Sequence, residues 1–390
     1  MFEKSKEELK AFGAQYTVLE IKQQPELWLK SFQYYKDNEE QIDSFLKGII
    51  GIYKRVRVIF TGAGTSAYIG DTILPYLKKM VNEKVYELEA VPTTSIVSNP
   101  LEYFKEDIPT VLVSFARSGN SPESIAAVEL GEKFVKNFYQ MNITCTPDGE
   151  LAKRTKNDAN NLMLLMPNRS NDLGFAMTSS FTCMLLTALL VFDKSAISIK
   201  EKYVKAVCEM GRSVIHREAD IERYVKLDFD RVIYLGSGSL AGLTREAQLK
   251  LLELTAGQIA TMFDSSMGFS HGPKSFVNGN SIAFIFVSND KYTRQYDLDI
   301  IKELQNDDIA KAVVSLQTET VENANGETFM FDSEFNIIPD AYLALPYIVF
   351  AQIFALLTSI KVKNRPDTPS ISGTVNRVVK GVTIHNNLEI

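Results

Sequence analysis

Two carboxylates and a lysine recur at helical spacing in the segment from Thr244 to Thr255, which reads TREAQLKLLELT. Glu246, Lys250 and Glu253 stand at i, i+4 and i+7 of the helix that this segment predicts, beside a stripe of leucines. A carboxylate in this setting is suited to moving a proton to or from carbon, because partial burial raises its pKa toward neutrality. A solvated face of surface ion pairs would have the same spacing.

A histidine follows this segment in a loop. His271 lies in the stretch Phe-Ser-His-Gly-Pro, where glycine and proline fix a loop and hold the imidazole clear of a helix. Such a group could act as an acid or a base near neutral pH. Because a single histidine is often structural, the residue type alone leaves both interpretations open.

Two segments rich in glycine and hydroxyl groups each follow an apolar run. Residues 58–68 read VIFTGAGTSAY and residues 114–124 read SFARSGNSPES. Small residues let backbone N–H groups approach a ligand, and the N-terminus of a following helix adds a positive dipole. We therefore predict a phosphate site built from Gly64, Thr65, Ser66, Arg117, Ser118, Gly119, Asn120 and Ser121.

The same two segments are compatible with a dinucleotide site, a plain turn or a helix cap. A dinucleotide fingerprint would need a third glycine where Ala67 stands, so that match is weak. An unliganded turn is possible at Gly62 to Gly64. Ser121 followed by Pro122 is also typical of a helix start, with the serine as N-cap.

Short apolar runs alternate with helical stretches along most of the chain, which indicates βαβ units and parallel sheets. Residues 1–50 predict helices. The predicted strands are 57–60, 111–115, 162–166, 231–234, 282–287 and 312–316.

The strands fall into two sets that can be aligned. Gly62 matches Gly236 and Ser114 matches Ser288, and each partner lies 174 residues further along. Two anchors at one offset indicate an internal repeat, with a boundary in the charged helical stretch between about residues 195 and 226. The second copy lacks the glycine of the serine-rich loop and gains Asp290, so we expect no phosphate there.

Composition narrows the function classes. The 390 residues carry a net charge of −6, which disfavours nucleic acid as a partner. Three scattered histidines and three unpaired cysteines indicate neither a metal site nor disulfides, and no cofactor is required. The N-terminus does not resemble a secretory signal, so we expect a cytoplasmic protein.

Residues 341–360 are apolar enough to span a membrane. They are interrupted by Pro346 and Gln352, so we expect a buried core or subunit-interface helix instead.

The motifs together resemble the double sugar-isomerase (SIS) architecture. Residues 62–66, 117–123 and 271–273 are similar to the isomerase half of glucosamine-6-phosphate synthase. Residues 174–180 and 263–273 resemble more closely the galactosamine-6-phosphate deaminase group, also called tagatose-6-phosphate ketose/aldose isomerases. The resemblance implies two tandem α/β SIS domains, each a mainly parallel sheet between helix layers. The predicted ranges are a helical segment 1–50, SIS domains 51–200 and 201–365, and a tail 366–390 that closes the active site.

The resemblance also implies residue roles. Glu253 matches the proton-shuttling carboxylate and Lys250 a lysine that positions it, while His271 matches a ring-opening histidine that comes from the partner subunit. Lys380 matches an imine-forming lysine in the tail. This implies a homodimer or homotetramer with a shared active site.

Some positions depart from the synthase. Ala116 and Met177 stand where the synthase has a phosphate-binding and a sugar-contacting serine, so the sugar epimer stays open. The chain also lacks a glutaminase domain, which disfavours glutamine-driven amination as its activity.

The resemblance favours an enzyme that converts galactosamine 6-phosphate into tagatose 6-phosphate and ammonia, by ring opening, transfer of a proton from C2 to C1 and ketimine hydrolysis. One alternative is a tagatose-6-phosphate-type ketose/aldose isomerase without deamination. Another is a sugar-phosphate-sensing regulatory protein without catalysis.

Overall fold

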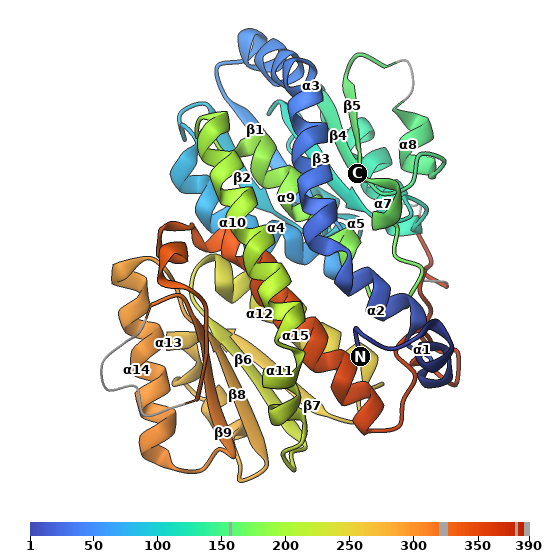
Figure 1. Cartoon of the computed structure of the whole chain (residues 1–390). Coiled ribbons are helices and arrows are strands. Elements are labelled where there is room, and N and C mark those ends of the chain that lie inside the picture. Colours follow the sequence, from blue (N-terminus) through green and yellow to red (C-terminus); the bar gives the residue numbers. More distant parts are fainter. Residues whose placement is uncertain (156–157, 320–326, 379–380, 386–390) are drawn as a thin grey trace. The chain divides into compact units, whose positions relative to one another are not determined.

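The computed structural model describes residues 1–155, 158–319, 327–378 and 381–385. The chain forms two compact units, each built on one sheet. The first-sheet unit comprises Lys30–Asp172, Ser179–Ser195 and Ser372–Ile390, and the second-sheet unit comprises Met1–Leu29, Leu173–Thr178 and Ala196–Ile371. Figure 1 shows both sheets with their flanking helices.

The first-sheet unit holds five parallel strands in the order β2-β1-β3-β4-β5. The strands are β1 (Val56–Thr61), β2 (Tyr86–Ala90), β3 (Thr110–Ala116), β4 (Phe138–Thr144) and β5 (Asn161–Leu165). The helices are α4 (Thr65–Met80), α5 (Thr93–Ser98), α6 (Pro100–Tyr103), α7 (Pro122–Phe134), α8 (Glu150–Arg154), η1 (Asn168–Ser170) and α9 (Ser179–Phe192).

Helices cover both faces of this sheet. Ile59 and Leu112 lie side by side in the parallel register and belong to a core cluster that α5 and α7 complete. Phe60 points to the other face, where its ring meets Phe192 of α9 edge-on at 5.1 Å between centroids. Because successive residues of a strand point to opposite faces, a strand that is buried throughout, such as 56–61, requires this covering on two sides.

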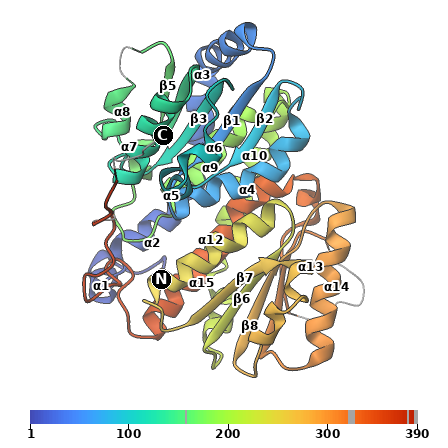
Figure 2. The ribbon, with the colours of Figure 1, turned by 180° about the vertical axis from the view of Figure 1, so that it is seen from behind.

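The second-sheet unit holds five parallel strands in the order β10-β9-β8-β6-β7. Figure 2 shows β7, β6 and β8 running side by side. The strands are β6 (Arg231–Gly236), β7 (Ala260–Ser265), β8 (Ser281–Phe286), β9 (Ala312–Gln317) and β10 (Glu327–Met330). The helices are α1 (Lys6–Phe12), α2 (Gln15–Lys22), α10 (Ile197–His216), α11 (Glu218–Val225), α12 (Ser239–Leu254), α13 (Ser266–Phe269), η2 (Pro273–Phe276), α14 (Lys291–Asp307), η3 (Ser333–Ile337) and α15 (Asp340–Lys361).

Helix α15 lies in the core of the second-sheet unit, where it packs against α10, α11 and α12. Its Phe350 and Phe354 stack edge-on against Phe284 of β8 at 5.3 and 4.8 Å between ring centroids. Among the described residues it is the helix that is long and apolar enough to cross a membrane, yet 94% of its apolar window is buried in the protein. It is therefore the core helix that the sequence predicts, with Pro346 inside it.

Helix α3 (Gln24–Ile52) contributes its first turns to the second-sheet unit and the rest to the first-sheet unit. Contacts along residues 1–29 tie them to the rest of the second-sheet unit, as three examples show. Gln24 donates to the Gln352 side-chain oxygen at 2.6 Å, Thr17 donates to Asp367 at 2.8 Å, and Trp28 lies against Gly211. The compact units thus differ from the predicted ranges, in which residues 1–50 stand apart.

The fold class is confirmed, because both units are three-layer α/β/α arrangements around a parallel sheet. When read from β1 and from β6, the two strand orders are the same. The six predicted strands all form, and β2, β4, β7 and β10 are additional.

Candidate active site

The turn between β1 and α4 requires glycine at two positions. A Cβ on Gly62 would lie 2.6 Å from the Ser66 carbonyl carbon, a clash with backbone. Gly64 is the N-cap of α4 with φ 55° and ψ −129°, a conformation that L side chains rarely adopt. The turn therefore brings the N-terminus of α4, with the buried Thr65 and Ser66, to the carboxyl end of β1.

The loop after β3 lies at the same edge of the sheet, because β1 and β3 are parallel neighbours. Hydrogen bonds to neutral groups hold this loop. The Ser118 hydroxyl accepts the Asn120 N–H at 3.3 Å, and the Asn120 side-chain oxygen accepts the Glu150 N–H at 2.9 Å. Gly119, with φ 66°, accepts the Leu151 N–H at 3.1 Å through its carbonyl. The structure thus brings the predicted phosphate loops to neighbouring strand ends.

Helix α7 begins as predicted, with Ser121 at the N-cap position and Pro122 at the first helical position. The Ser121 hydroxyl, however, accepts no backbone N–H. It bonds to the Ser124 hydroxyl at 2.6 Å instead. The capping position is confirmed, whereas capping by the side chain is not.

Arg117 is buried, and its guanidinium donates to the backbone carbonyl of Arg377 in the C-terminal segment. It was predicted to bind the substrate phosphate. The contact found here is with the chain itself, and the phosphate role stays a prediction.

Helix α12 carries the predicted proton-transfer residues. Lys250 is fully buried and lies 3.2 Å from a Glu246 carboxylate oxygen and 2.7 Å from a Glu253 carboxylate oxygen. Glu246 is also fully buried, and the side chain of Glu253 is 24% exposed. Burial favours the neutral amine, but the two carboxylates outweigh it and raise the pKa of Lys250. The stripe is therefore a buried ion triad, not a solvated face.

This triad directs one carboxylate outward. Lys250 holds the carboxylate of Glu253 in place by a short hydrogen bond, while Glu246 keeps Lys250 charged from the buried side. A positioned and partly exposed carboxylate is the arrangement that general base catalysis needs.

His271 lies in the second-sheet unit between α13 and η2, and it is exposed. Its backbone N–H bonds to Gly268, and Gly272 after it has φ 125°. Within the described part of the chain, no contact joins its imidazole to the α12 triad. Lys380 lies outside the described residues.

The loop ends of the second sheet are occupied by acidic side chains of the same unit. The Asp297 carboxylate on α14 accepts hydrogen bonds from the hydroxyls of Ser237 and Ser266, both at 2.5 Å, and from the Ser288 N–H at 2.9 Å. Asp340 accepts the Ser288 hydroxyl at 2.5 Å and the Asn289 N–H at 2.8 Å. The prediction that this loop holds no phosphate is supported by these carboxylates, which would repel an anion.

Burial raises the pKa of Asp297 to about 6, although its three hydrogen-bond donors act in the opposite direction. The acid noted from the sequence, Asp290, has a different role. It caps α14 by accepting the Thr293 N–H at 2.9 Å. Nothing in the local pattern around Asp297 marked it as the residue that fills this loop.

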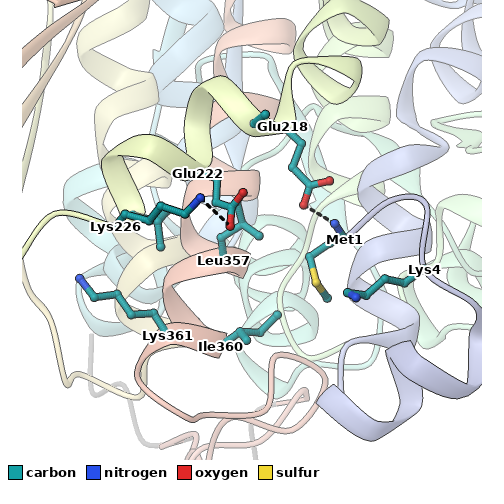
Figure 3. A pocket seen from close by; sticks show the side chains of 10 residues that line it. Met1, Lys4, Glu218, Glu222, Lys226, Leu357, Ile360 and Lys361 are labelled. Carbon is teal, nitrogen blue, oxygen red and sulfur yellow. Dashed lines mark hydrogen bonds and ion pairs between the residues drawn. The ribbon is translucent and has the colours of Figure 1, made fainter.

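A pocket of about 450 Å³ lies elsewhere in the second-sheet unit, between the N-terminus, α11 and α15. Figure 3 shows the Met1 amino group paired with Glu218 and Lys226 paired with Glu222 at its wall. None of the predicted site residues lines it. In the described ranges, no group of three or more His, Cys, Asp or Glu could hold a metal ion.

Comparison with known proteins shows which family this chain belongs to. The SIS domain family matches residues 51–193. D-galactosamine-6-phosphate deaminase AgaS of Shewanella sp. (strain ANA-3) is 40% identical over 98% of this chain and 94% of its own length. The chain belongs to the D-galactosamine-6-phosphate deaminase family of SIS-domain enzymes. The family resemblance of the motifs is thereby confirmed.

Solved structures agree with this assignment. The tagatose-6-phosphate ketose/aldose isomerase from Escherichia coli has 39% identity and a TM-score of 0.87, over 95% of this chain and 96% of that one. The C-terminal domain of the glucosamine-fructose-6-phosphate aminotransferase from Francisella tularensis has 19% identity and a TM-score of 0.72, over 89% and 96%. The latter likeness concerns the fold alone.

Proposed function

We propose that this SIS-domain enzyme converts galactosamine 6-phosphate and water into tagatose 6-phosphate and ammonia. The observation that carries the proposal is the α12 triad, in which buried Lys250 holds a partly exposed Glu253. The name of the Shewanella relative, which matches nearly the whole chain, supports the substrate. A triad of this kind suits proton transfer at carbon, the step that deamination and isomerisation share.

The steps follow from the residue chemistry. His271 gives a proton to the ring oxygen as the bond from C1 to that oxygen breaks, and the anomeric hydroxyl loses its proton to water, which leaves the open-chain aldehyde. Glu253 takes the C2 proton of the open-chain aldehyde, and Lys250 holds the Glu253 carboxylate in position for this transfer. Glu253 returns the proton at C1, which leaves a C2 ketimine. Water adds to the ketimine carbon and ammonia leaves, so one water is consumed for each ammonia released.

The substrate phosphate binds in the first-sheet unit. Its ligands are the backbone amides and hydroxyls of residues 64–66 and 118–121, with the N-termini of α4 and α7 directed toward the anion. Arg117 supplies positive charge beside this loop. The nearby Cys145 takes no part, because burial raises the pKa of its thiol to about 12.

The enzyme works as a homodimer or homotetramer in which His271 of one subunit serves the active site of another. His271 is exposed, and two large apolar side chains of the same segment are exposed with it: Phe263 is 40% exposed and Met267 56%. Apolar groups in such positions are typical of an interface. Lys380 is assigned to the tail of this site. We place the enzyme in the cytoplasm, in keeping with the three buried cysteines, which form no disulfide in the described part of the chain.

The direct test is ammonia release by the purified protein from galactosamine 6-phosphate and from glucosamine 6-phosphate in parallel, without glutamine or added metal. Release from galactosamine 6-phosphate supports the proposal, and preference for the other epimer corrects the substrate. The contacts of Met177, which is half-buried, would then be the first place to look for the epimer preference.

A second candidate is ketose/aldose isomerisation without ammonia loss, which is favoured by the name of the Escherichia coli structure. Interconversion of a ketose and an aldose 6-phosphate, with no ammonia from either amino sugar, would establish it. Binding without any turnover would instead indicate a regulatory sugar-phosphate sensor.

A further inference from the structure

The C-terminal segment returns to the first-sheet unit and contacts it through Arg377. The Arg377 guanidinium donates to the Asn171 side-chain oxygen at 3.2 Å and to the Asp172 carbonyl at 2.9 Å. The Arg377 carbonyl in turn accepts a hydrogen bond from Arg117. Arg377 therefore holds the loop after β5 with its side chain and the loop after β3 with its backbone.

A further pair of hydrogen bonds joins the same two loops through the loop after β4. The Thr146 hydroxyl donates to the Arg117 carbonyl at 2.9 Å. The same hydroxyl accepts the Asn171 side-chain amide at 3.2 Å. Arg117, Thr146, Asn171 and Arg377 thus form a closed hydrogen-bond ring.

The ring lies at the carboxyl ends of three neighbouring strands, because β3, β4 and β5 pair in parallel in that order. Arg117 immediately precedes residues 118–121, the proposed phosphate loop. Both its carbonyl and its guanidinium belong to the ring. A movement of this loop must therefore shift Arg117, and any shift of Arg117 acts on the docked tail.

The loop after β5, which carries Asn171 of the ring, is anchored to α9. The Asp172 carboxylate is buried and accepts the N–H groups of Ser179 and Ser180 at 3.1 and 2.8 Å, at the start of α9. A carboxylate at a helix N-terminus is a stable anchor. Arg377 thus docks onto a segment that is anchored to the start of α9, whereas Arg117 belongs to a glycine-containing loop.

We propose that this ring docks the C-terminal segment 372–378 and couples the docking to phosphate binding at residues 118–121, so that Thr146 and Asn171 are positioning residues of the reaction. The coupling rests on the proposed function, which assigns phosphate to this loop. By linkage, an anion that orders the loop strengthens docking, and a docked tail strengthens anion binding by the same factor.

The test is trypsin cleavage after Arg377, followed by mass spectrometry of the released fragment that begins at Val378. Trypsin must take the Arg377 side chain out of the ring, so the cleavage rate reports the undocked fraction when docking is fast. Asn171→Ala removes both side-chain links, and Thr146→Val breaks the ring with little change of shape. We expect each variant to be cleaved about tenfold faster, the effect of losing hydrogen bonds of typical strength.

Asn160→Ala is the matched control, because Asn160 is exposed at the other end of β5. It should be cleaved at the wild-type rate. Inorganic phosphate should slow cleavage of the wild type and of Asn160→Ala, and this protection should be lost in both ring variants. With galactosamine 6-phosphate, the ring variants should raise KM more than they lower kcat.

Unchanged cleavage in both ring variants would overturn the ring as the docking device. Faster cleavage in these variants with equal phosphate protection in all proteins would overturn the coupling. The cleavage comparison without phosphate needs no turnover, so it decides the ring even where the wild type releases no ammonia and the proposed function fails.

Discussion

The turn after β1 and the turn after β6 have nearly the same backbone. Gly64 has φ 55° and ψ −129°, and Gly238 has φ 55° and ψ −124°. Each is the N-cap of a helix of 16 residues that follows a strand at the same place in its sheet. The loops after β3 and β8 then differ in what their polar groups contact.

In the first sheet, the hydrogen bonds of residues 118–121 join neutral groups. In the second sheet, hydroxyls and amides from three loops converge on the carboxylates of Asp297 and Asp340. The same backbone can thus present its donors to an outside anion or to an internal one. Side chains from elsewhere in the unit decide between these outcomes.

The largest effect should come from the proton-transfer carboxylate. Glu253→Gln removes the base but keeps the shape, so kcat for ammonia release should fall about 10² to 10⁴-fold. Phosphate binding to the first-sheet unit should remain, as measured by the rise in melting temperature with inorganic phosphate. The exposed Glu209→Gln serves as control, and an unchanged kcat in Glu253→Gln would refute the assignment.

A large loss in the free energy of unfolding is expected when Lys250 is replaced. Lys250→Met leaves the fully buried Glu246 without its cation, which costs about 3 to 5 kcal/mol in free energy of unfolding. The double variant Glu246→Gln/Lys250→Met should recover part of that loss, because it no longer buries an unpaired charge. Urea unfolding measures both. Lys202→Met at an exposed position is the control, and equal loss in the single and double variants would contradict a buried ion triad.

A smaller effect on stability is expected from Asp297, the carboxylate that accepts hydrogen bonds from the loops of the second sheet. The pKa of Asp297 is raised from 3.8 to about 6, so the folded state holds this proton more tightly than the unfolded chain does. The resulting stabilisation is present below about pH 4 and is lost as pH rises through about 6. Relative to Asp297→Asn, the wild type should lose up to about 3 kcal/mol between about pH 4 and pH 7.

Denaturant unfolding across that pH range measures this difference. The exposed Asp299→Asn, on the same helix, should keep the wild-type pH dependence. A parallel pH profile for Asp297→Asn and the wild type would show that this carboxylate is not the titrating group.

The smallest effects are expected from alanine substitutions that compare the two glycine turns directly. A Cβ at either position meets backbone of the following helix, but at 2.6 Å from Ser66 for Gly62 and at the less severe distance of 3.0 Å from Leu240 for Gly236. Gly62→Ala should raise KM about tenfold to a hundredfold, because it displaces the start of α4 from the phosphate. Gly236→Ala should lower the free energy of unfolding by about 1 kcal/mol and leave KM within about twofold of wild type. Equal KM values would remove the functional contrast between the turns.

Much of the fold could be read from the sequence because the signals are local. Buried strands such as β1 and β8 are mostly apolar, and their boundaries agree with prediction within one or two residues. β4 was missed although it is an interior strand, because it buries the polar Gln140 and Asn142. The edge strand β7 was missed because its exposed and half-exposed residues carry no apolar run.

The sequence likewise predicts part of the candidate site. The spacing of Glu246, Lys250 and Glu253 places them on one helical stripe, but only packing shows that two of them are fully buried. The sequence does not reveal that Asp297 fills the second set of loops. It gives no role to Asn171 or Thr146, since their partners lie far along the chain.

By itself, the sequence determined the two parallel α/β halves, the glycine turns and the helix that carries Glu253, since each depends on residues within one or two turns of one another. The tertiary structure decided which donors meet an internal carboxylate and where Arg377 docks. The physical reason is that hydrogen bonds such as Arg377 to Asn171 join residues some 200 positions apart, and periodicity carries no information about pairs at that separation.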